Sequence, residues 1–146
     1  MQELSMHVLD IAENSVKAGA QLTRIGISIN TAQKRLELVV ADNGCGMSAE
    51  LAARVTDPFC TSRTTRKVGL GLPFLKMAAE LTGGGMKLES TPGRGTTVTA
   101  WFVLGHIDLA PLGDMASTVT TLMQCNPDVD FVYTLAVDGE SFCADS

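Results

Sequence analysis

The spacing of the apolar residues most constrains the fold of this chain, because it changes from the period of a helix to that of a strand. Residues 3–19 carry apolar side chains at helical intervals, which predicts a helix that stops at Gly19. Residues 24–30 alternate polar with apolar side chains, as a half-buried strand does, and residues 36–41 form a second, more apolar strand. The polar segment 31–35 between them predicts a hairpin.

The rest of the chain shows the same two periods in turn. Ser48 is a suitable N-cap for a short helix, Pro73 suits a helix start, and Asp138-Gly139 suits a hairpin turn. The expected elements are a helix over 49–55, a loop over 57–71, a helix from Pro73 to Gly83, strands at 86–90 and 96–104, a helix over 111–125, and strands at 130–137 and 140–143. This order predicts an α+β fold, a two-layer sandwich in which helices cover one face of a sheet.

Composition narrows the function classes. With 146 residues the chain suits one domain with its own core. Its net charge of -5 and pI near 4.9 argue against non-specific nucleic-acid binding, which needs clustered Lys and Arg. The scattered cysteines predict reduced thiols rather than disulfides or a zinc site. Neither a signal-peptide pattern nor an apolar run of about 18 residues is found, so we expect a cytoplasmic protein without a membrane segment.

Four separated motifs carry side chains suited to chemistry, and the first lies in the N-terminal helix. Asp10 and Asn14 are spaced to share one helix face, with Glu13 beside Asp10. An Asn carbonyl is a suitable magnesium ligand, and a neighbouring carboxylate can orient or deprotonate an attacking group. Taken alone, this stripe is more commonly a solvated helix face, with Lys17 as an ion-pair partner.

The second motif follows the second strand of the first hairpin. Asp42 stands at a strand end, where a carboxylate can accept a hydrogen bond from an exocyclic amine such as that of adenine. Gly44 and Gly46 permit a close backbone approach that a side chain would forbid. The plain alternative is an ordinary tight turn.

The third and fourth motifs are weaker alone. Gly69 and Gly71 precede a helix, whose first N–H groups can bind an anion such as phosphate, and the loop before them holds three basic residues, Arg63, Arg66 and Lys67. Thr96 starts a strand and can bond to a base edge or to a water beside it. A flexible connection and a good strand-forming residue explain the same features.

Together, the order and intervals of these motifs resemble the GHKL superfamily of DNA gyrase, heat-shock-ninety chaperones, histidine kinases and MutL-type proteins. The resemblance covers residues 3–104 and rests on five boxes: Asp10–Asn14 continuing to Ala20, Asp42–Gly46, Asp57–Ser62 at the start of the ATP lid, Gly69–Leu72, and Gly93–Thr96. It implies a Bergerat fold, a mixed and mostly antiparallel sheet with helices on one face. We therefore expect an ATP-binding domain at 1–104 and a C-terminal helix and strand extension at 105–146, packed on the same domain.

The resemblance also implies the cofactors ATP and Mg²⁺ and a set of site residues. Asn14 would ligate the metal, Asp42 would read the adenine amino group with support from Thr96, and Asp10 would be catalytic. Further nucleotide contacts are implied for Lys17, Gly44, Gly46, Met47, Phe59, Arg66, Lys67, Gly69, Leu70, Gly71 and Leu72.

Two departures from the superfamily pattern bear on activity. Gyrase-type members carry Glu where this chain has Asp10, which is one methylene shorter, so vigorous hydrolysis is in doubt. We expect no phosphoacceptor domain before the motifs, and we expect His7 and His106, the only histidines in this sequence, to be ordinary core or surface residues.

Two functions remain after this reading. The leading hypothesis is a kinase-like ATPase that acts in trans on a protein partner, as anti-sigma-factor kinases do. The alternative is a nucleotide-gated binding module with little catalysis. An ATPase of a mismatch-repair or topoisomerase machine is disfavoured by the acidic charge, and a homodimer is left open.

Overall fold

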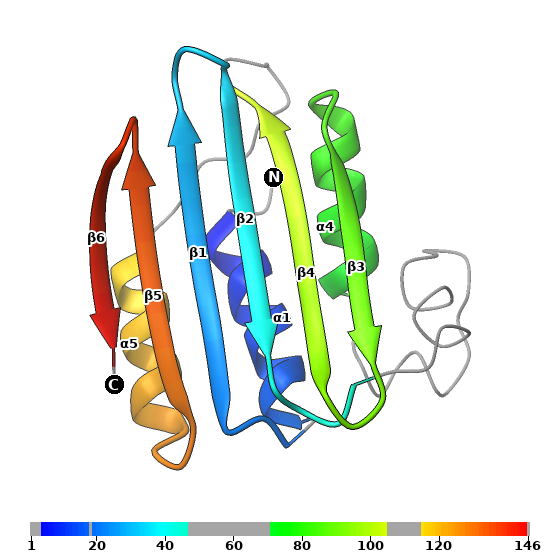
Figure 1. Cartoon of the computed structure of the whole chain (residues 1–146), viewed down its shortest axis with the longest axis vertical. Helices are drawn as coiled ribbons and strands as arrows, with labels where there is room; N and C mark the ends of the chain where they lie inside the picture. The colour runs from blue at the N-terminus through cyan, green and yellow to red at the C-terminus, as the bar shows by residue number, and fades with distance from the viewer. Residues whose placement is uncertain (1–3, 18, 47–70, 105–114, 146) are drawn as a thin grey trace.

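The computed structural model describes residues 4–17, 19–46, 71–104 and 115–145. Within these ranges the elements follow one another as helices and hairpins (Figure 1). In chain order they are α1 (Leu4–Lys17), β1 (Leu22–Asn30), β2 (Arg35–Asp42), α4 (Gly71–Leu81), β3 (Gly85–Thr91), β4 (Gly95–Val103), α5 (Met115–Cys125), β5 (Asp130–Val137) and β6 (Glu140–Asp145).

The strands form a six-stranded sheet in the order β3-β4-β2-β1-β5-β6. Neighbouring strands are antiparallel, except that β1 and β5 run parallel. The helices α1, α4 and α5 all lie on one face of this sheet (Figure 1). The predicted α+β sandwich with a mixed, mostly antiparallel sheet is therefore confirmed, while the division into 1–104 and 105–146 stays a prediction.

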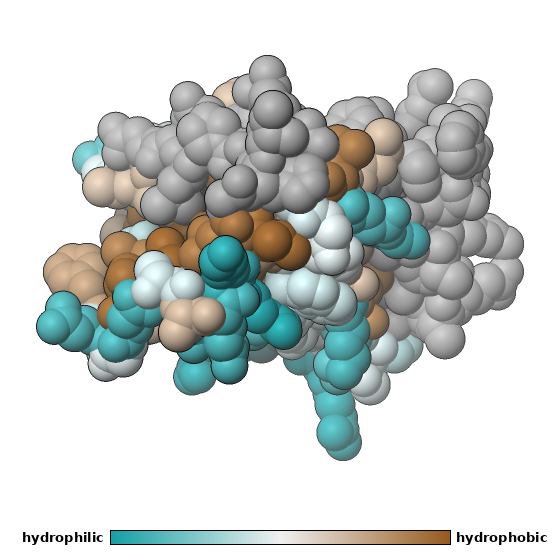
Figure 2. Space-filling view, turned by 90° about the horizontal axis from the view of Figure 1, so that it is seen from above, coloured by the Kyte–Doolittle hydropathy of each residue, from teal (hydrophilic) through white to brown (hydrophobic). Residues whose placement is uncertain are grey.

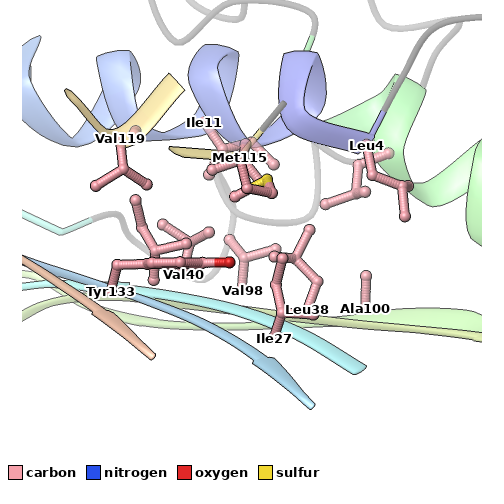
Figure 3. Close-up of a cluster of buried hydrophobic side chains, with 14 of the residues drawn as sticks. Leu4, Ile11, Ile27, Leu38, Val40, Val98, Ala100, Met115, Val119 and Tyr133 are labelled. Atoms are coloured by element: carbon pink, nitrogen blue, oxygen red, sulfur yellow. The ribbon is translucent and has the colours of Figure 1, made fainter. Parts of the chain in front are cut away.

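The core lies between the two layers and follows from the alternation along the strands. On β1, Ile25 and Ile27 are buried, whereas Arg24 and Ser28 face the open side of the sheet and are exposed. Figure 3 shows how side chains from both layers meet: Leu4 and Ile11 from α1, Met115 and Val119 from α5, and Ile27, Leu38, Val40, Val98, Ala100 and Tyr133 from the strands. Seen along the strands, a band of apolar residues crosses the molecule, and hydrophilic residues line the side of the sheet that faces away from the helices (Figure 2).

Both predicted helix stops are confirmed by backbone hydrogen bonds. After α1, the N–H of Gly19 donates to the carbonyl of Val16, and the N–H of Ala20 donates to the backbone carbonyl of Ser15. After α4, the N–H of Gly84 donates to the carbonyl of Ala79 in the same pattern, which satisfies carbonyls that a helix end leaves unpaired.

Some boundaries differ from the expected ones. Helix α4 begins at Gly71 rather than at Pro73, because proline is tolerated throughout the first turn, where N–H groups have no partner within the helix. Strand β1 begins at Leu22, before the predicted start, because its pairing with β5 and β2 continues past the alternating segment. The predicted helix over 49–55, the loop at 57–70 and residues 111–114 lie outside the described residues. None of the described helices has the length and apolarity that crossing a membrane requires.

His7 is an unusual polar residue in this core. It lies on α1, is 3 % exposed, and its Nδ1 atom has no hydrogen-bond partner in the described part of the chain. Burial lowers the pKa of His7 below its usual value, and the negative charge of Asp10 partly offsets this. The expectation of an ordinary core histidine thus agrees with its burial. Because burial disfavours the charged form, protonation of His7 costs free energy in the folded protein.

We expect wild type to lose unfolding free energy more steeply than His7→Leu as the pH falls from about 7.5 to about 5.5. The folded pKa lies below the unfolded value of 6.5, so the unfolded chain binds a proton that folded His7 does not. Stability is lost as the pH falls through the unfolded value, by at most about 1.4 kcal/mol per pH unit for this one proton. Urea unfolding of both proteins at both pH values measures the difference, and identical pH dependence would contradict the prediction.

Candidate functional site

A row of polar residues crosses the sheet at the end of β2. Asp42 pairs in register with Thr23 on β1 and with Thr96 on β4, and Thr96 pairs with Ser90 on β3. These residues continue the alternation of the buried positions before or after them, so they lie on the face that packs against the helices. Four neighbouring strands thus bring a carboxylate and three hydroxyls into one row on the helix side of the sheet.

The Asp42 carboxylate receives a hydrogen bond on each oxygen. Ser15 Oγ donates to Oδ2 at 2.8 Å, and the N–H of Gly44 donates to Oδ1 at 2.8 Å. The Thr96 hydroxyl, beside Asp42 in register, instead lies 2.8 Å from Ser90 Oγ. The orientation of Asp42 is therefore set by α1 on one side and by its own loop on the other.

The loop after Asp42 is held at both of its flanks. Asn43 Oδ1 accepts hydrogen bonds from the N–H groups of Gln21 at 2.8 Å and Leu22 at 2.9 Å, which ties the loop to the start of β1. The N–H of Gly93, in the turn between β3 and β4, donates to the carbonyl of Cys45 at 2.7 Å. The loop is thus clamped between two other parts of the sheet.

Glycine is needed where this loop and that turn touch. A Cβ at Gly46, whose φ is +71°, would lie 2.1 Å from the carbonyl oxygen of Thr91. A Cβ at Gly95 would lie 2.0 Å from the carbonyl oxygen of Asp42. The backbone of the Asp42 loop therefore packs directly on the backbone of the β3–β4 turn, a contact that the sequence did not predict.

The remaining predicted residues are placed as follows. Asp10, which is half-buried, lies one turn before Asn14 on α1, and Lys17 ends this helix. Gly71 and Leu72 are the first residues of α4, so the second glycine box does open a helix. Three segments meet at the lower edge of the sheet in Figure 1: the end of α1, the Asp42 loop and the β3–β4 turn. The first turn of α4 is at the lower end of that helix in the same view. The other predicted contacts lie outside the described residues: Met47, Phe59, Arg66, Lys67, Gly69 and Leu70.

The Asp42 carboxylate is a partly buried hydrogen-bond acceptor beside Ser15 of α1. A carboxylate with both donors in place still offers lone pairs to an incoming N–H group. Across the described ranges, no three His, Cys, Asp or Glu side chains gather into a metal-binding cluster. A magnesium ion here would therefore rely on an amide or carboxylate of α1 together with oxygens of its ligand, which is how Mg²⁺ is commonly bound beside phosphates.

Comparison with known proteins decides the family. The model of the histidine kinase-, DNA gyrase B- and HSP90-like ATPases matches residues 2–106. This chain belongs to that family. As a GHKL domain it is an ATP-binding, kinase-like module, and the resemblance seen in the motifs is confirmed.

Several bacterial kinases are similar to this GHKL domain. Sensor protein kinase FleS of Pseudomonas aeruginosa is 39% identical over 105 residues, which cover 72% of this chain and 25% of that protein. Sporulation kinase D of Bacillus subtilis is 34% identical over 92 residues, covering 63% and 18%. Histidine protein kinase DivJ of Caulobacter vibrioides is 34% identical over 100 residues, covering 66% and 17%. The chain thus spans a quarter or less of the length of these relatives.

Ser15 is a site residue to which sequence reasoning gave no role. It lies directly after Asn14, and its position continues the apolar stripe of Leu4, Val8 and Ile11. A serine on the buried face of an amphipathic helix is out of pattern, and that is the signal that points to it.

Thr23 is the second residue of the GHKL site that the sequence did not single out. It is 0 % exposed, and its hydroxyl has no hydrogen-bond partner in the described part of the structure. An unsatisfied buried hydroxyl costs about 1–3 kcal/mol. Because Thr23 pairs in register with Asp42, replacing its hydroxyl tests whether the buried group beside Asp42 is unpaired.

We expect Thr23→Val to raise the unfolding free energy by about 1 kcal/mol, because it replaces an unpaired hydroxyl with a methyl of similar size. Thr82→Val is the matched control. Thr82 is equally buried, but its hydroxyl donates to the Ala79 carbonyl at 2.9 Å and accepts from the Val103 N–H at 3.1 Å, so this variant should be destabilised. Urea unfolding measures both, and similar losses in the two variants would refute the assignment of Thr23 as unpaired.

Proposed function

We propose that this domain binds ATP with Mg²⁺ and transfers the terminal phosphoryl group in trans to a protein partner. The observation that carries the proposal is the Asp42 carboxylate, which is recessed at a strand end and bonded at 2.8 Å to Ser15 of the helix that bears Asn14. This bond links a group suited to read adenine with the helix suited to hold the metal. Kinases among the relatives and the acidic charge support a protein rather than a nucleic-acid partner.

The residues of α1 supply the chemistry in this proposal. The Asn14 amide and ligand phosphates would hold Mg²⁺, which supplies charge neutralisation at the phosphates. Asp10, one turn earlier, would accept the proton of the attacking acceptor group as the new phosphorus bond forms and ADP leaves. The start of α4 at Gly71 presents backbone N–H groups for the phosphates.

Transfer of label from γ-³²P-ATP tests this function. The protein is incubated with Mg²⁺ and with candidate partners that co-purify with it, and partner phosphorylation is measured for wild type, Asp10→Asn and Asn14→Ala. We expect label on a partner with wild type only. Tight ATP binding without any labelled partner would count against transfer in trans.

The alternative is a nucleotide-gated binding module with little catalysis. The observation that favours it is Asp10, whose side chain is one methylene shorter than the Glu of hydrolysing GHKL members. In this function ATP shifts the population of a partner-binding conformation. Equal, near-zero phosphate release by wild type and Asp10→Asn, together with ATP-dependent partner binding, would favour the module over the kinase.

A further inference from the structure

The Ser15 hydroxyl commits its proton to Asp42. Ser15 is 3 % exposed, and its Oγ lies 2.8 Å from Asp42 Oδ2 but 3.4 Å from the Ile11 carbonyl of its own helix. A hydroxyl has one proton to donate, and the shorter contact to a carboxylate is the stronger of the two. The bond therefore connects two elements rather than merely satisfying Ser15 within α1.

Asp42 has few other groups to orient it. Its second oxygen accepts from the Gly44 N–H, which belongs to the same turn. Thr96 bonds to Ser90, and the Thr23 hydroxyl has no hydrogen-bond partner among the residues that the structure describes. Within the described ranges, Ser15 is the side chain that donates to this carboxylate.

We propose that Ser15 is a positioning residue for base recognition, which holds the Asp42 carboxylate in the plane that accepts the 6-amino group of adenine. This inference rests on the proposed nucleotide site and deepens it. A carboxylate only accepts hydrogen bonds, so it selects a base edge that donates, and its selectivity depends on its orientation. Because Ser15 directly follows Asn14 in the chain, the placement of α1 determines both where the base would bind and where the metal would bind.

The test compares two nucleotides that differ at one group. Calorimetry gives the dissociation constants of ATP and of purine ribonucleoside triphosphate, which lacks the 6-amino group, for the full chain with Mg²⁺. Ser15→Ala should weaken ATP binding roughly 5- to 20-fold and leave the purine analogue unchanged. In the Asp42→Asn background, Ser15→Ala should add no further loss.

A control variant at another hydroxyl and a second substitution at Ser15 show whether the effect is specific to the Ser15 hydrogen bond. Thr120→Ala removes a hydroxyl that donates to its own helix at Ala116, at 2.8 Å on α5, and should leave both nucleotides unchanged. Ser15→Cys keeps the side-chain size with a weak donor, so it should also lose part of the ATP preference.

The possible outcomes separate a failure of the Ser15 inference from a failure of the proposed nucleotide site. Equal weakening of both nucleotides by Ser15→Ala would assign Ser15 a purely structural role and overturn the inference. Wild-type ATP preference in Ser15→Ala or Ser15→Cys would also overturn it while leaving the nucleotide site intact. If wild type binds neither nucleotide, the proposed function itself fails.

Discussion

Asp42→Asn is expected to weaken ATP binding by about 1–3 kcal/mol, which is a factor of roughly 5 to 150. The amide keeps the shape of the side chain but turns one acceptor oxygen into a donor. Since Gly44 N–H and Ser15 Oγ both donate to Asp42, one of these groups or the adenine amine then faces another donor. Calorimetry with ATP and Mg²⁺ measures the loss.

Asp138→Asn is the matched control for this change. Asp138, in the turn between β5 and β6, also accepts one backbone and one hydroxyl hydrogen bond, both from Thr31 and both at 2.8 Å. Its partner Thr31 follows the end of β1, whereas Asp42 pairs with Thr23 near the start of β1. Asp138 thus lies at the opposite end of the sheet, and the same loss of charge there should leave ATP affinity unchanged. If Asp42→Asn binds ATP as tightly as Asp138→Asn, Asp42 does not read the base.

Gly95→Ala is expected to destabilise the fold by about 2–5 kcal/mol and to abolish ATP binding in the population that remains folded. The added Cβ would lie 2.0 Å from the Asp42 carbonyl oxygen and 2.9 Å from Asn43 Cα, which are backbone atoms that cannot swing away. Relief of the clash requires the Asp42 loop to move off the β3–β4 turn. Urea unfolding and calorimetry measure the two effects.

Gly93→Ala separates backbone strain from this clash. Gly93 lies in the same turn with φ +79°, but a Cβ there meets no atom within 4 Å. Only the strain of a left-handed backbone remains, about 1–2 kcal/mol, and ATP binding should persist. Equal losses in the two variants would show that close approach at Gly95 is unimportant.

The sequence predicted those features that depend on local spacing. The apolar run at 36–41 placed Asp42 directly after a strand, and the glycine box at 69–72 placed a helix start close to Gly71. These predictions succeed because a side chain's face follows from its distance to its neighbours in the chain.

The features that the sequence did not predict depend on how distant elements pack. Ser15 and Asp42 are 27 residues apart, and their hydrogen bond requires α1 to cross the sheet over the end of β2. Likewise the segment at 130–137 reads as a strand, but no local pattern says that it pairs with β1 rather than with β3 at the other edge. Crossing position and strand partner are set by the sum of core contacts, which single-sequence periodicity does not contain.

The parallel pairing of β1 with β5 has a consequence for biosynthesis. One long side of β1, from Leu22 to Ile29, has its partner in residues 130–137, far along the sequence from β1. While the ribosome is still adding residues before 130, that side presents unpaired N–H and C=O groups, a template on which other nascent chains can add a strand. The interval before residues 130–137 leave the ribosome is thus the period in which β1 is most open to pairing with another chain.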